Sequence, residues 1–175
     1  MHNKLTTQIL AGKYKGKKLD LPSLEVTRSS KARVKESYFN RIQFDMIDAI
    51  FVELFAGSGS VGLEALSRGA KKVYFFEKDK NSYKVLNSNI NKLDSSRCEA
   101  KQGDTFVLID LLITALKIRN EKVYIFLDPP FSYRNEMDEI YTNTLEIIKK
   151  LPKEIVEMIT IEHMSELALP DNIGI

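Results

Sequence analysis

Five short apolar runs alternate with helical patterns along residues 50–163, and this order limits the fold more than any other feature of the chain. The runs are IFVELF (50–55), KVYFFE (72–77), CEAKQ (98–102), KVYIFLD (122–128) and IVEMITIEH (155–163). The helices predicted between them cover residues 60–68, 80–91, 105–119 and 137–150. Strands that are apolar nearly throughout are typical of sheets covered by helices on both faces. The alternation therefore predicts an α/β fold, a three-layer, Rossmann-like, doubly wound and mostly parallel sheet.

The N-terminal part differs from the rest in charge. Residues 1–41 contain ten Lys or Arg residues and three Asp or Glu residues, a net charge of +7 in a chain whose total is +2. Residues 4–21 predict a small basic hairpin that turns near Lys15 and Gly16. Residues 29–42 predict a helix with Val34, Tyr38 and Ile42 on one face. We interpret residues 1–175 as one domain, in which residues 1–45 extend a Rossmann-like core of residues 46–175.

Composition excludes several classes of protein. With 175 residues, 43% of them hydrophobic, the chain is long enough for one substantial core. It lacks a run of the ~18–20 apolar residues that a membrane span needs and an apolar leader at its start. One cysteine, Cys98, and two histidines give no metal-binding constellation, and we interpret Cys98 and His163 as structural. We expect a cytoplasmic protein, and a monomer because no strong dimerisation stripe is visible.

A glycine loop follows the first predicted strand. Gly57, Gly59 and Gly62 have the spacing G-x-G-x-x-G, and the first two let the backbone turn tightly and approach a ligand. Glu77 ends the second strand, where a carboxylate accepts hydrogen bonds from ribose hydroxyls. Asp104 follows the third strand. These features indicate an adenosine-containing cofactor, and they are compatible with both NAD and S-adenosylmethionine.

Two further features favour S-adenosylmethionine. Glu53, just before the glycine loop, would repel a pyrophosphate and attract the ammonium of a methionine moiety. The tetrapeptide Asp128-Pro129-Pro130-Phe131 follows the fourth strand. There the Asp128 carboxylate and the Pro129 carbonyl can accept hydrogen bonds from an exocyclic amine and aim its lone pair, while the prolines hold these acceptors in place. Phe131 offers a surface on which an extruded base stacks.

Four segments together resemble one protein family. They are ILAGKYKGKKLDLP, TRSSKARVKESYFN, VELFAGSGSVGLEALSRGAKKVYFFEKD and FLDPPF, and the resemblance runs over residues 8–163. They are similar to the RsmD family of bacterial 16S rRNA guanine-N2 methyltransferases, within the class I S-adenosylmethionine-dependent methyltransferases. The resemblance implies the class I methyltransferase fold, methylation of the N2 amine of a guanine in 16S rRNA, and the small ribosomal subunit as partner.

The resemblance also implies roles for individual residues. The cofactor loop would comprise Glu53, Phe55, Gly57 and Gly59, with Glu77 at the ribose and Asp104 near the adenine of S-adenosylmethionine. The target amine would meet Asp128, Pro129, Pro130 and Phe131. Arg28, Ser29, Ser30 and Arg33 would lie at the mouth of the site, near RNA or the methionine end of the cofactor. With the lysines of the hairpin, the candidate RNA-binding residues are Lys13, Lys15, Lys17, Lys18, Arg28 and Arg33. No metal is implied.

The end of the sequence departs from the family pattern. Class I methyltransferase sheets have seven strands, and only MSELALPDNIGI follows His163. Twelve residues are too few for two strands and a turn, so we expect strands 6 and 7 to be missing.

Three alternative functions stay open at this point. The D-P-P-aromatic motif also suits a DNA adenine-N6 methyltransferase, although the sequence has no insertion long enough for a separate target-recognition region. The glycine spacing alone suits an NAD-dependent oxidoreductase. The basic N-terminus alone suits a non-catalytic RNA-binding module.

Overall fold

The computed structural model describes residues 5–22, 28–130 and 137–163 of the chain. Within them, five parallel strands form one sheet in the order β5-β4-β3-β6-β7. The strands are β3 (Ile50–Leu54), β4 (Lys72–Glu77), β5 (Cys98–Gln102), β6 (Val123–Leu127) and β7 (Val156–Ile161). The predicted doubly wound α/β sheet is thereby confirmed. Its strand order reverses beside β3, because β4 lies on one side of it and β6 on the other.

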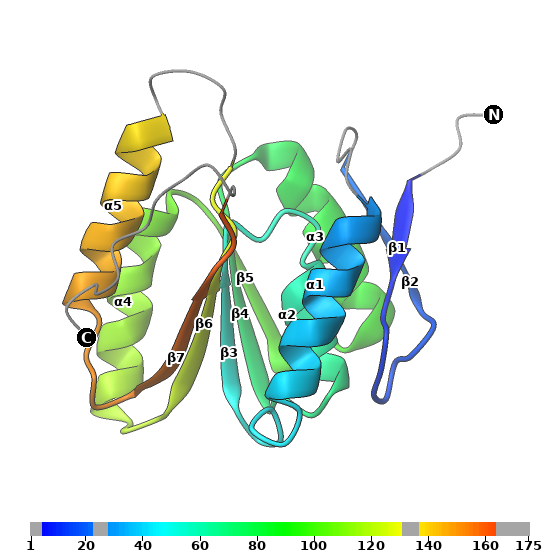
Figure 1. The fold of residues 1–175 in the computed structure, drawn as a ribbon, viewed down its shortest axis with the longest axis horizontal. Helices are drawn as coiled ribbons and strands as arrows, with labels where there is room; N and C mark the ends of the chain where they lie inside the picture. Colours follow the sequence, from blue (N-terminus) through cyan, green and yellow to red (C-terminus); the bar gives the residue numbers. More distant parts are fainter. Residues whose placement is uncertain (1–4, 23–27, 131–136, 164–175) are drawn as a thin grey trace.

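Helices cover both faces of the sheet, giving three layers (Figure 1). One face carries α1 (Arg28–Arg41), α2 (Ser60–Ser67) and α3 (Lys80–Leu93), and the other carries α4 (Thr105–Ile118) and α5 (Met137–Lys150). A short 3-10 helix, η1 (Ser95–Arg97), precedes β5. The four helices α2–α5 lie where the sequence predicts them, with ends that differ by at most two residues.

Each face of the sheet has its own core, because successive side chains of a strand point to opposite faces. Phe51 of β3 and Phe75 of β4 pack with residues of α1, α2 and α3. Val52 of β3 and Phe76 of β4 pack with residues of α4 and α5. Full burial of such side chains contributes roughly 1.5–3 kcal/mol each, so the two cores together fix the sheet between its helical layers.

The predicted basic hairpin is also present. Strands β1 (Thr6–Gln8) and β2 (Lys18–Asp20) pair antiparallel as a separate two-stranded sheet. The predicted turn is confirmed: the Lys17 amide donates to the Tyr14 carbonyl at 3.1 Å, and Gly16 has the left-handed φ of 82° that this turn requires. Ile9 and Leu19 of the hairpin are buried in the core formed with α1, α2 and α3. The hairpin is therefore packed on the sheet domain.

The buried face of α1 differs from the predicted one. Val34 is 52% exposed, whereas Phe39 and Ile42 are buried. Lys35 occupies the same face, one turn before Phe39, and is only 7% exposed. The prediction was wrong for Val34 because it followed apolar residues only, and a buried lysine stands where the pattern calls for an apolar side chain.

The prediction that strands 6 and 7 are missing needs correction. Counted along the chain, seven strands are present in the described residues, because the two strands of the hairpin precede the five of the main sheet. The last two, β6 and β7, are the runs predicted at residues 122–128 and 155–163. The prediction was drawn from the residues that follow His163, and residues 164–175 lie outside the described part of the chain.

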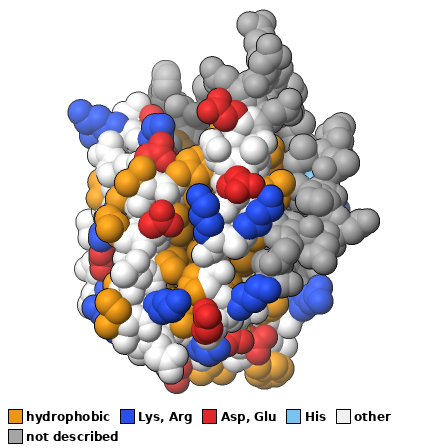
Figure 2. Space-filling model, turned by 90° about the vertical axis from the view of Figure 1, so that its left-hand side faces the viewer, with side chains coloured by type: hydrophobic (Ala, Val, Ile, Leu, Met, Phe, Trp, Pro, Cys, Tyr) orange, Lys and Arg blue, Asp and Glu red, His pale blue; other side chains and the backbone are white. Residues whose placement is uncertain are grey.

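Helix α4 exposes hydrophobic side chains on the side of the molecule that carries α4 and α5 (Figure 2). Val107, Leu111 and Ile118 are 64%, 65% and 82% exposed. The sequence analysis did not recognise this stripe, and the monomeric state stays a prediction. No helix in the described residues is both long and apolar enough to cross a membrane.

The corrected face of α1 is testable by two substitutions. Phe39→Ala removes a fully buried ring and should lower the free energy of unfolding by about 3–5 kcal/mol. Val34→Ala, at an exposed position of the same helix, should change it by less than about 0.5 kcal/mol. Urea unfolding followed by circular dichroism measures both. A larger loss for Val34→Ala than for Phe39→Ala would restore the face predicted from sequence.

Candidate functional site

A cavity of about 520 Å³ lies where four neighbouring strands of the sheet end. Its lining comes from the segments after β3, β4, β5 and β6, with one residue of α5: Phe55, Gly57, Glu77, Lys78, Asp79, Ser82, Asp104, Thr105, Phe106, Asp128, Pro129, Pro130 and Ile140. The carboxyl ends of the strands, next to the point where the strand order reverses, are where doubly wound sheets bind ligands. The volume suits a ligand of cofactor size.

The glycine loop (residues 55–59) forms one wall of this cavity. Phe55, Gly57 and Gly59 all have a left-handed backbone, with φ of 60°, 53° and 75°. A Cβ atom at Gly59 would overlap Cδ1 of Leu86, which is itself fully buried, so a side chain at this position would clash. The Phe55 ring packs edge-on against Phe106 at 5.7 Å between ring centres, which joins the loops after β3 and β5.

Glu77 joins the loops that follow β3 and β4. Its Oε2 accepts a hydrogen bond from the Gly57 amide at 2.6 Å, and its Oε1 accepts one from the Asp79 amide at 2.7 Å. Each carboxylate oxygen has a second lone pair. Glu77, a lining residue that is 9% exposed, is thus held rigidly while it keeps acceptor capacity towards the cavity.

Asp104 and Lys78 form an ion pair at the edge of the cavity, with 3.0 Å between Oδ2 and Nζ. Asp104 also caps α4, since its Oδ1 accepts from the Phe106 amide at 3.0 Å. The hydrogen bond from Lys78 is the main cause that lowers the pKa of Asp104. Asp79 caps α3 in the same way, through the Asn81 and Ser82 amides. The wall between β4 and β5 therefore carries ionised carboxylates at neutral pH.

Asp128, Pro129 and Pro130 line the cavity opposite this wall, directly after β6. The Asp128 amide donates to the Leu54 carbonyl at 3.4 Å, which ties this segment to the end of β3. The structure thus brings Asp128 and the two prolines to the same cavity as Glu77 and Asp104. Phe131, the fourth residue of the predicted motif, lies outside the described residues.

Glu53 does not line the cavity. It shares the α2 side of β3 with Phe51, two residues earlier, and is 3% exposed. Its Oε2 accepts from the Gly62 amide at 2.8 Å and its Oε1 from the Val61 amide at 3.4 Å. Burial raises the pKa of this carboxyl to about 8, against the opposing effect of these two amides. The carboxyl therefore occupies the N-terminus of α2, and its assignment to the cofactor stays a prediction.

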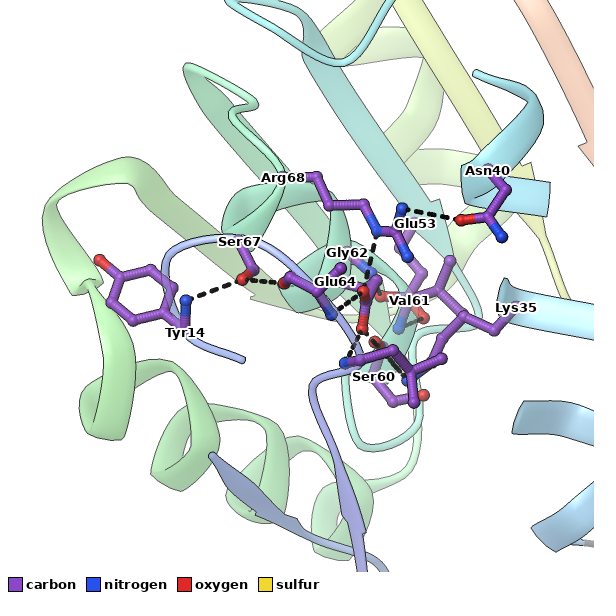
Figure 3. A network of polar contacts seen from close by, with 12 residues as sticks. Tyr14, Lys35, Asn40, Glu53, Ser60, Val61, Gly62, Glu64, Ser67 and Arg68 are labelled. Atoms are coloured by element: carbon purple, nitrogen blue, oxygen red, sulfur yellow. Dashed lines mark hydrogen bonds and ion pairs between the residues drawn. The ribbon is translucent and has the colours of Figure 1, made fainter. Parts of the chain in front are cut away.

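Glu64, which the sequence analysis did not single out, is the centre of a buried polar network (Figure 3). Its Oε2 accepts from the Leu10 amide at 2.8 Å and its Oε1 from the Ala11 amide at 3.0 Å. It also forms ion pairs with Arg68, at 2.9 Å, and with Lys35, at 3.8 Å. The signal in the sequence was a lone carboxylate in the apolar segment SVGLEAL. This network fastens the basic hairpin and α1 to α2.

The candidate RNA-binding lysines surround the tip of the hairpin. Lys13, Lys15, Lys17 and Lys18 are all exposed, as is Arg33 on α1. The backbone between the lysines is fixed, since the Tyr14 amide donates to Ser67 Oγ at 2.9 Å and the Lys13 amide to the Ser67 carbonyl at 2.8 Å. The side chains of Arg28, Ser29 and Ser30 lie outside the described part of the chain.

A family model decides the affiliation of the chain. The model described as "Conserved hypothetical protein 95", which represents the RsmD family, matches residues 7–175. The chain belongs to this family.

Two curated relatives of this RsmD-family chain show how much of the protein is shared. The "Ribosomal RNA small subunit methyltransferase D" of Haemophilus influenzae is 37% identical over 129 residues, which are 72% of this chain and 64% of that protein. The chain thus matches less than two thirds of that relative's length. "Putative rRNA methyltransferase YlbH" of Bacillus subtilis is 30% identical over 168 residues, which are 95% of this chain and 88% of that protein.

A solved structure of a "putative methylase" from Haemophilus influenzae has the same fold. It superposes with a TM-score of 0.59 at 28% identity, over 95% of this chain and 88% of that one. The predicted class I methyltransferase fold is confirmed for the RsmD-family chain.

Several lining residues were missed from the sequence. Lys78 and Asp79 directly follow Glu77, and Thr105 and Phe106 directly follow Asp104, so their place at the strand ends was a usable signal. Ile140 comes from α5, and nothing in the sequence connects it to the site. In the described residues there is no group of three or more His, Cys, Asp or Glu that could hold a metal ion.

The burial of Glu53 predicts a pH dependence of stability. With a pKa of about 8 in the folded chain, against an ordinary 4.5, the folded state keeps a proton that the unfolded state has lost. Stability must then fall as the pH rises from 4.5 to 8, by up to ~1.4 kcal/mol per pH unit from this group. Glu53→Gln keeps an oxygen for the Gly62 amide and has no proton to lose. Urea unfolding at pH 5–8 should show the variant gaining stability relative to the wild type as pH rises. A constant difference between the two proteins would mean that Glu53 ionises normally.

Proposed function

We propose that this chain is an S-adenosylmethionine-dependent methyltransferase that acts on the exocyclic N2 amine of a guanine in 16S rRNA of the small ribosomal subunit. The observation that carries the proposal is the meeting of two motifs in one cavity. Glu77 and Asp104 are suited to a nucleoside, and Asp128 with Pro129 is suited to an amine. The names of the RsmD-family relatives support a ribosomal RNA substrate.

The residues of the cavity fit S-adenosylmethionine. We assign the free lone pairs of Glu77 to the ribose hydroxyls and the Asp104 carboxylate to the adenine edge. The two aromatic rings Phe55 and Phe106 provide an apolar wall between these groups. The cofactor supplies a methyl group on a sulfonium that is already activated for transfer. The protein's task is then mainly to position the acceptor.

The N-terminus of α2 argues against a dinucleotide. In dinucleotide-binding folds, the pyrophosphate binds the backbone amides at the start of the helix after the first strand. Here the Glu53 carboxyl already accepts hydrogen bonds from the Val61 and Gly62 amides. A pyrophosphate would compete with the Glu53 carboxyl for these two amides, and it would have to displace that buried group to bind them. The glycine spacing therefore no longer supports an NAD-dependent oxidoreductase, because the helix amides that would bind the pyrophosphate already have a partner.

Asp128 has the central role at the target amine. The lone pair of an exocyclic amine is delocalised into the base, and hydrogen bonds accepted from its N–H groups localise that pair on nitrogen. We assign these acceptors to the Asp128 carboxylate and the Pro129 carbonyl. Pro129 is buried and its ring fixes φ, so that its carbonyl direction is set before a substrate arrives. A base reaches this position only when it is extruded from its helix or presented in a loop.

The basic hairpin suits the phosphates of the RNA. Lys13, Lys15 and Lys17 lie on a loop whose backbone is bonded to Ser67, so little flexibility is lost on binding. Lysine contacts to phosphate give affinity without sequence recognition. We infer that the hairpin holds the RNA while the cavity selects the amine.

Asp128→Ala tests the catalytic assignment. Methyl transfer to small ribosomal subunits that lack guanine-N2 methylation should fall by on the order of 100-fold or more, because the amine loses its charged acceptor. Affinity for S-adenosylhomocysteine should stay within about threefold, since the carboxylate is assigned to the amine and not to the nucleoside. Labelled methyl groups in digested nucleosides and calorimetry are the readouts.

The same assay separates the alternative functions. Naked 16S rRNA and duplex DNA serve as parallel substrates. Label in N2-methylguanosine supports the proposal, whereas label in methyladenine from DNA would replace it. Full transfer by the Asp128→Ala variant would remove Asp128 from its role. RNA binding with no methyl transfer to any substrate would leave the RNA-binding module as the function.

Reversing charges on the hairpin tests the RNA surface. The triple variant Lys15→Glu, Lys17→Glu, Lys18→Glu should lower the salt dependence of RNA affinity by about one unit of slope for each lost phosphate contact. The matched control reverses Lys149, Lys150 and Lys153, which lie at the end of α5 and just after it, with the same change in net charge. Filter binding over a range of salt concentrations measures the slope. Equal slopes for the two triple variants would mean that the hairpin makes no specific phosphate contacts.

A further inference from the structure

The ammonium group of Lys35, a residue of helix α1, is buried at the start of α2. Lys35 is 7% exposed, and its Nζ donates to the Ser60 carbonyl at 3.4 Å. The same Nζ lies 3.8 Å from Oε2 of Glu64. Figure 3 shows the side chain reaching from α1 to the first turn of α2. Ser60 directly follows Gly59, so this contact is made at the point where the glycine loop becomes a helix.

The burial of this lysine carries a cost that must be balanced. A lysine is almost never fully buried unless it is paired with opposite charge. Burial lowers the pKa of Lys35, and the neighbouring Glu64 and Glu53 oppose this effect. An exposed position on α1 would avoid the cost, and other basic residues of this helix, such as Arg33 and Arg41, are exposed. The buried position of Lys35 is thus the exception among them and calls for a specific role.

Lys35 and Glu53 hold the first turn of α2 from two sides. Lys35 bonds the carbonyl of Ser60, while Glu53 accepts from the amides of Val61 and Gly62. A Cβ atom at Gly62 would lie 2.9 Å from Oε2 of Glu53, so the carboxyl and the helix are already in close contact. The helix start therefore has little freedom to shift, and the loop that precedes it shares this constraint.

The hairpin adds a second support to the same loop. Asn89 of α3 is fully buried, and its Nδ2 donates to the carbonyl of Asp20 in β2 and to the carbonyl of Ser58 in the glycine loop, both at 2.9 Å. The N-terminal extension (residues 1–45) is thus connected to the glycine loop in two places. Lys35 contacts the residue after the loop directly, and Asp20 is linked to the loop through Asn89 of α3. Neither Lys35 nor Asn89 lines the cavity.

We propose that Lys35 is a positioning residue for the glycine loop, through which the N-terminal extension sets the affinity of the cofactor site. The inference rests on the proposed function, in which that loop binds S-adenosylmethionine. In this arrangement the extension has two roles. Its exposed lysines bind RNA, and its buried Lys35 holds the loop in the conformation that binds the cofactor.

Lys35→Met in the full chain is the direct test. Methionine fills a similar volume and cannot donate to the Ser60 carbonyl, so affinity for S-adenosylhomocysteine should fall at least tenfold. Lys35→Arg keeps the charge and the donors and should stay within about threefold of the wild type. Arg41→Met, an exposed position on the same helix, is the matched control and should bind like the wild type. Calorimetry well below the thermal midpoint of each variant gives the affinities, and circular dichroism confirms folding.

A second variant covers the case in which Lys35→Met does not fold. Lys35→Gln keeps a polar, uncharged side chain beside Glu64, which retains its Arg68 partner and the Leu10 and Ala11 amides. Glutamine is one bond shorter than lysine, and the Lys35 contact to the Ser60 carbonyl already spans 3.4 Å. The Ser60 carbonyl still lacks its donor, and the tenfold loss of affinity is expected to persist.

The outcomes are distinct. Unchanged affinity in a folded Lys35→Met or Lys35→Gln variant, with binding by the wild type, would overturn the positioning role and leave the proposed function intact. An equal loss of affinity in Lys35→Arg would also overturn the positioning role, because this variant keeps the charge and the hydrogen-bond donors to which the role is attributed. Failure of the wild type to bind S-adenosylhomocysteine would overturn the proposed function and this inference together.

Discussion

A carboxylate that is buried away from water must receive hydrogen bonds or charge from the protein, and Glu64 imposes this requirement on the whole N-terminal half. It is fully buried, and its donors come from the hairpin, from α1 and from α2 itself. Moving the hairpin away would remove two amide hydrogen bonds from this carboxylate, and moving α1 away would remove one of its two cationic partners. The position of the hairpin and the burial of Lys35 are both tied to this one group.

Two other carboxyls divide the tasks around the glycine loop. Glu53 precedes the last residue of β3 and Glu77 ends the neighbouring parallel strand β4, and both accept hydrogen bonds from backbone amides. Both oxygens of the Glu53 carboxyl accept hydrogen bonds from amides at the start of α2, whereas Glu77 lines the cavity and keeps lone pairs for a ligand. One carboxyl thus fixes the conformation of the loop and the other is available for recognition. Both side chains occupy the same side of the sheet, since Glu53 follows Phe51 and Glu77 follows Phe75 by two residues. Their different roles result from their positions along the strands, because Glu53 lies inside β3 whereas Glu77 is the last residue of β4.

The sequence was informative wherever local pattern decides the structure. The strands, the helices α2–α5 and the gathering of Glu77, Asp104 and Asp128 follow from apolar runs and from the rule that parallel strands end at one edge. The sequence misled where a partner distant in the chain decides. Val34 looked like a core residue because Lys35 was not expected to be buried, and the hydrogen bonds of Glu53 with the Val61 and Gly62 amides were not foreseen. Glu64 stayed unnoticed, since its donors Leu10 and Ala11 are more than fifty residues away.

The anchoring of the hairpin also has a consequence for the order of events during protein synthesis. Leu10 bonds to Glu64, 54 residues later, and Asp20 bonds to Asn89, 69 residues later. At roughly 5–20 residues per second, the ribosome takes several seconds to make this stretch of chain. Throughout that interval the hairpin has no partner to dock on. The hairpin therefore reaches its native place only after α2 and α3 have been made.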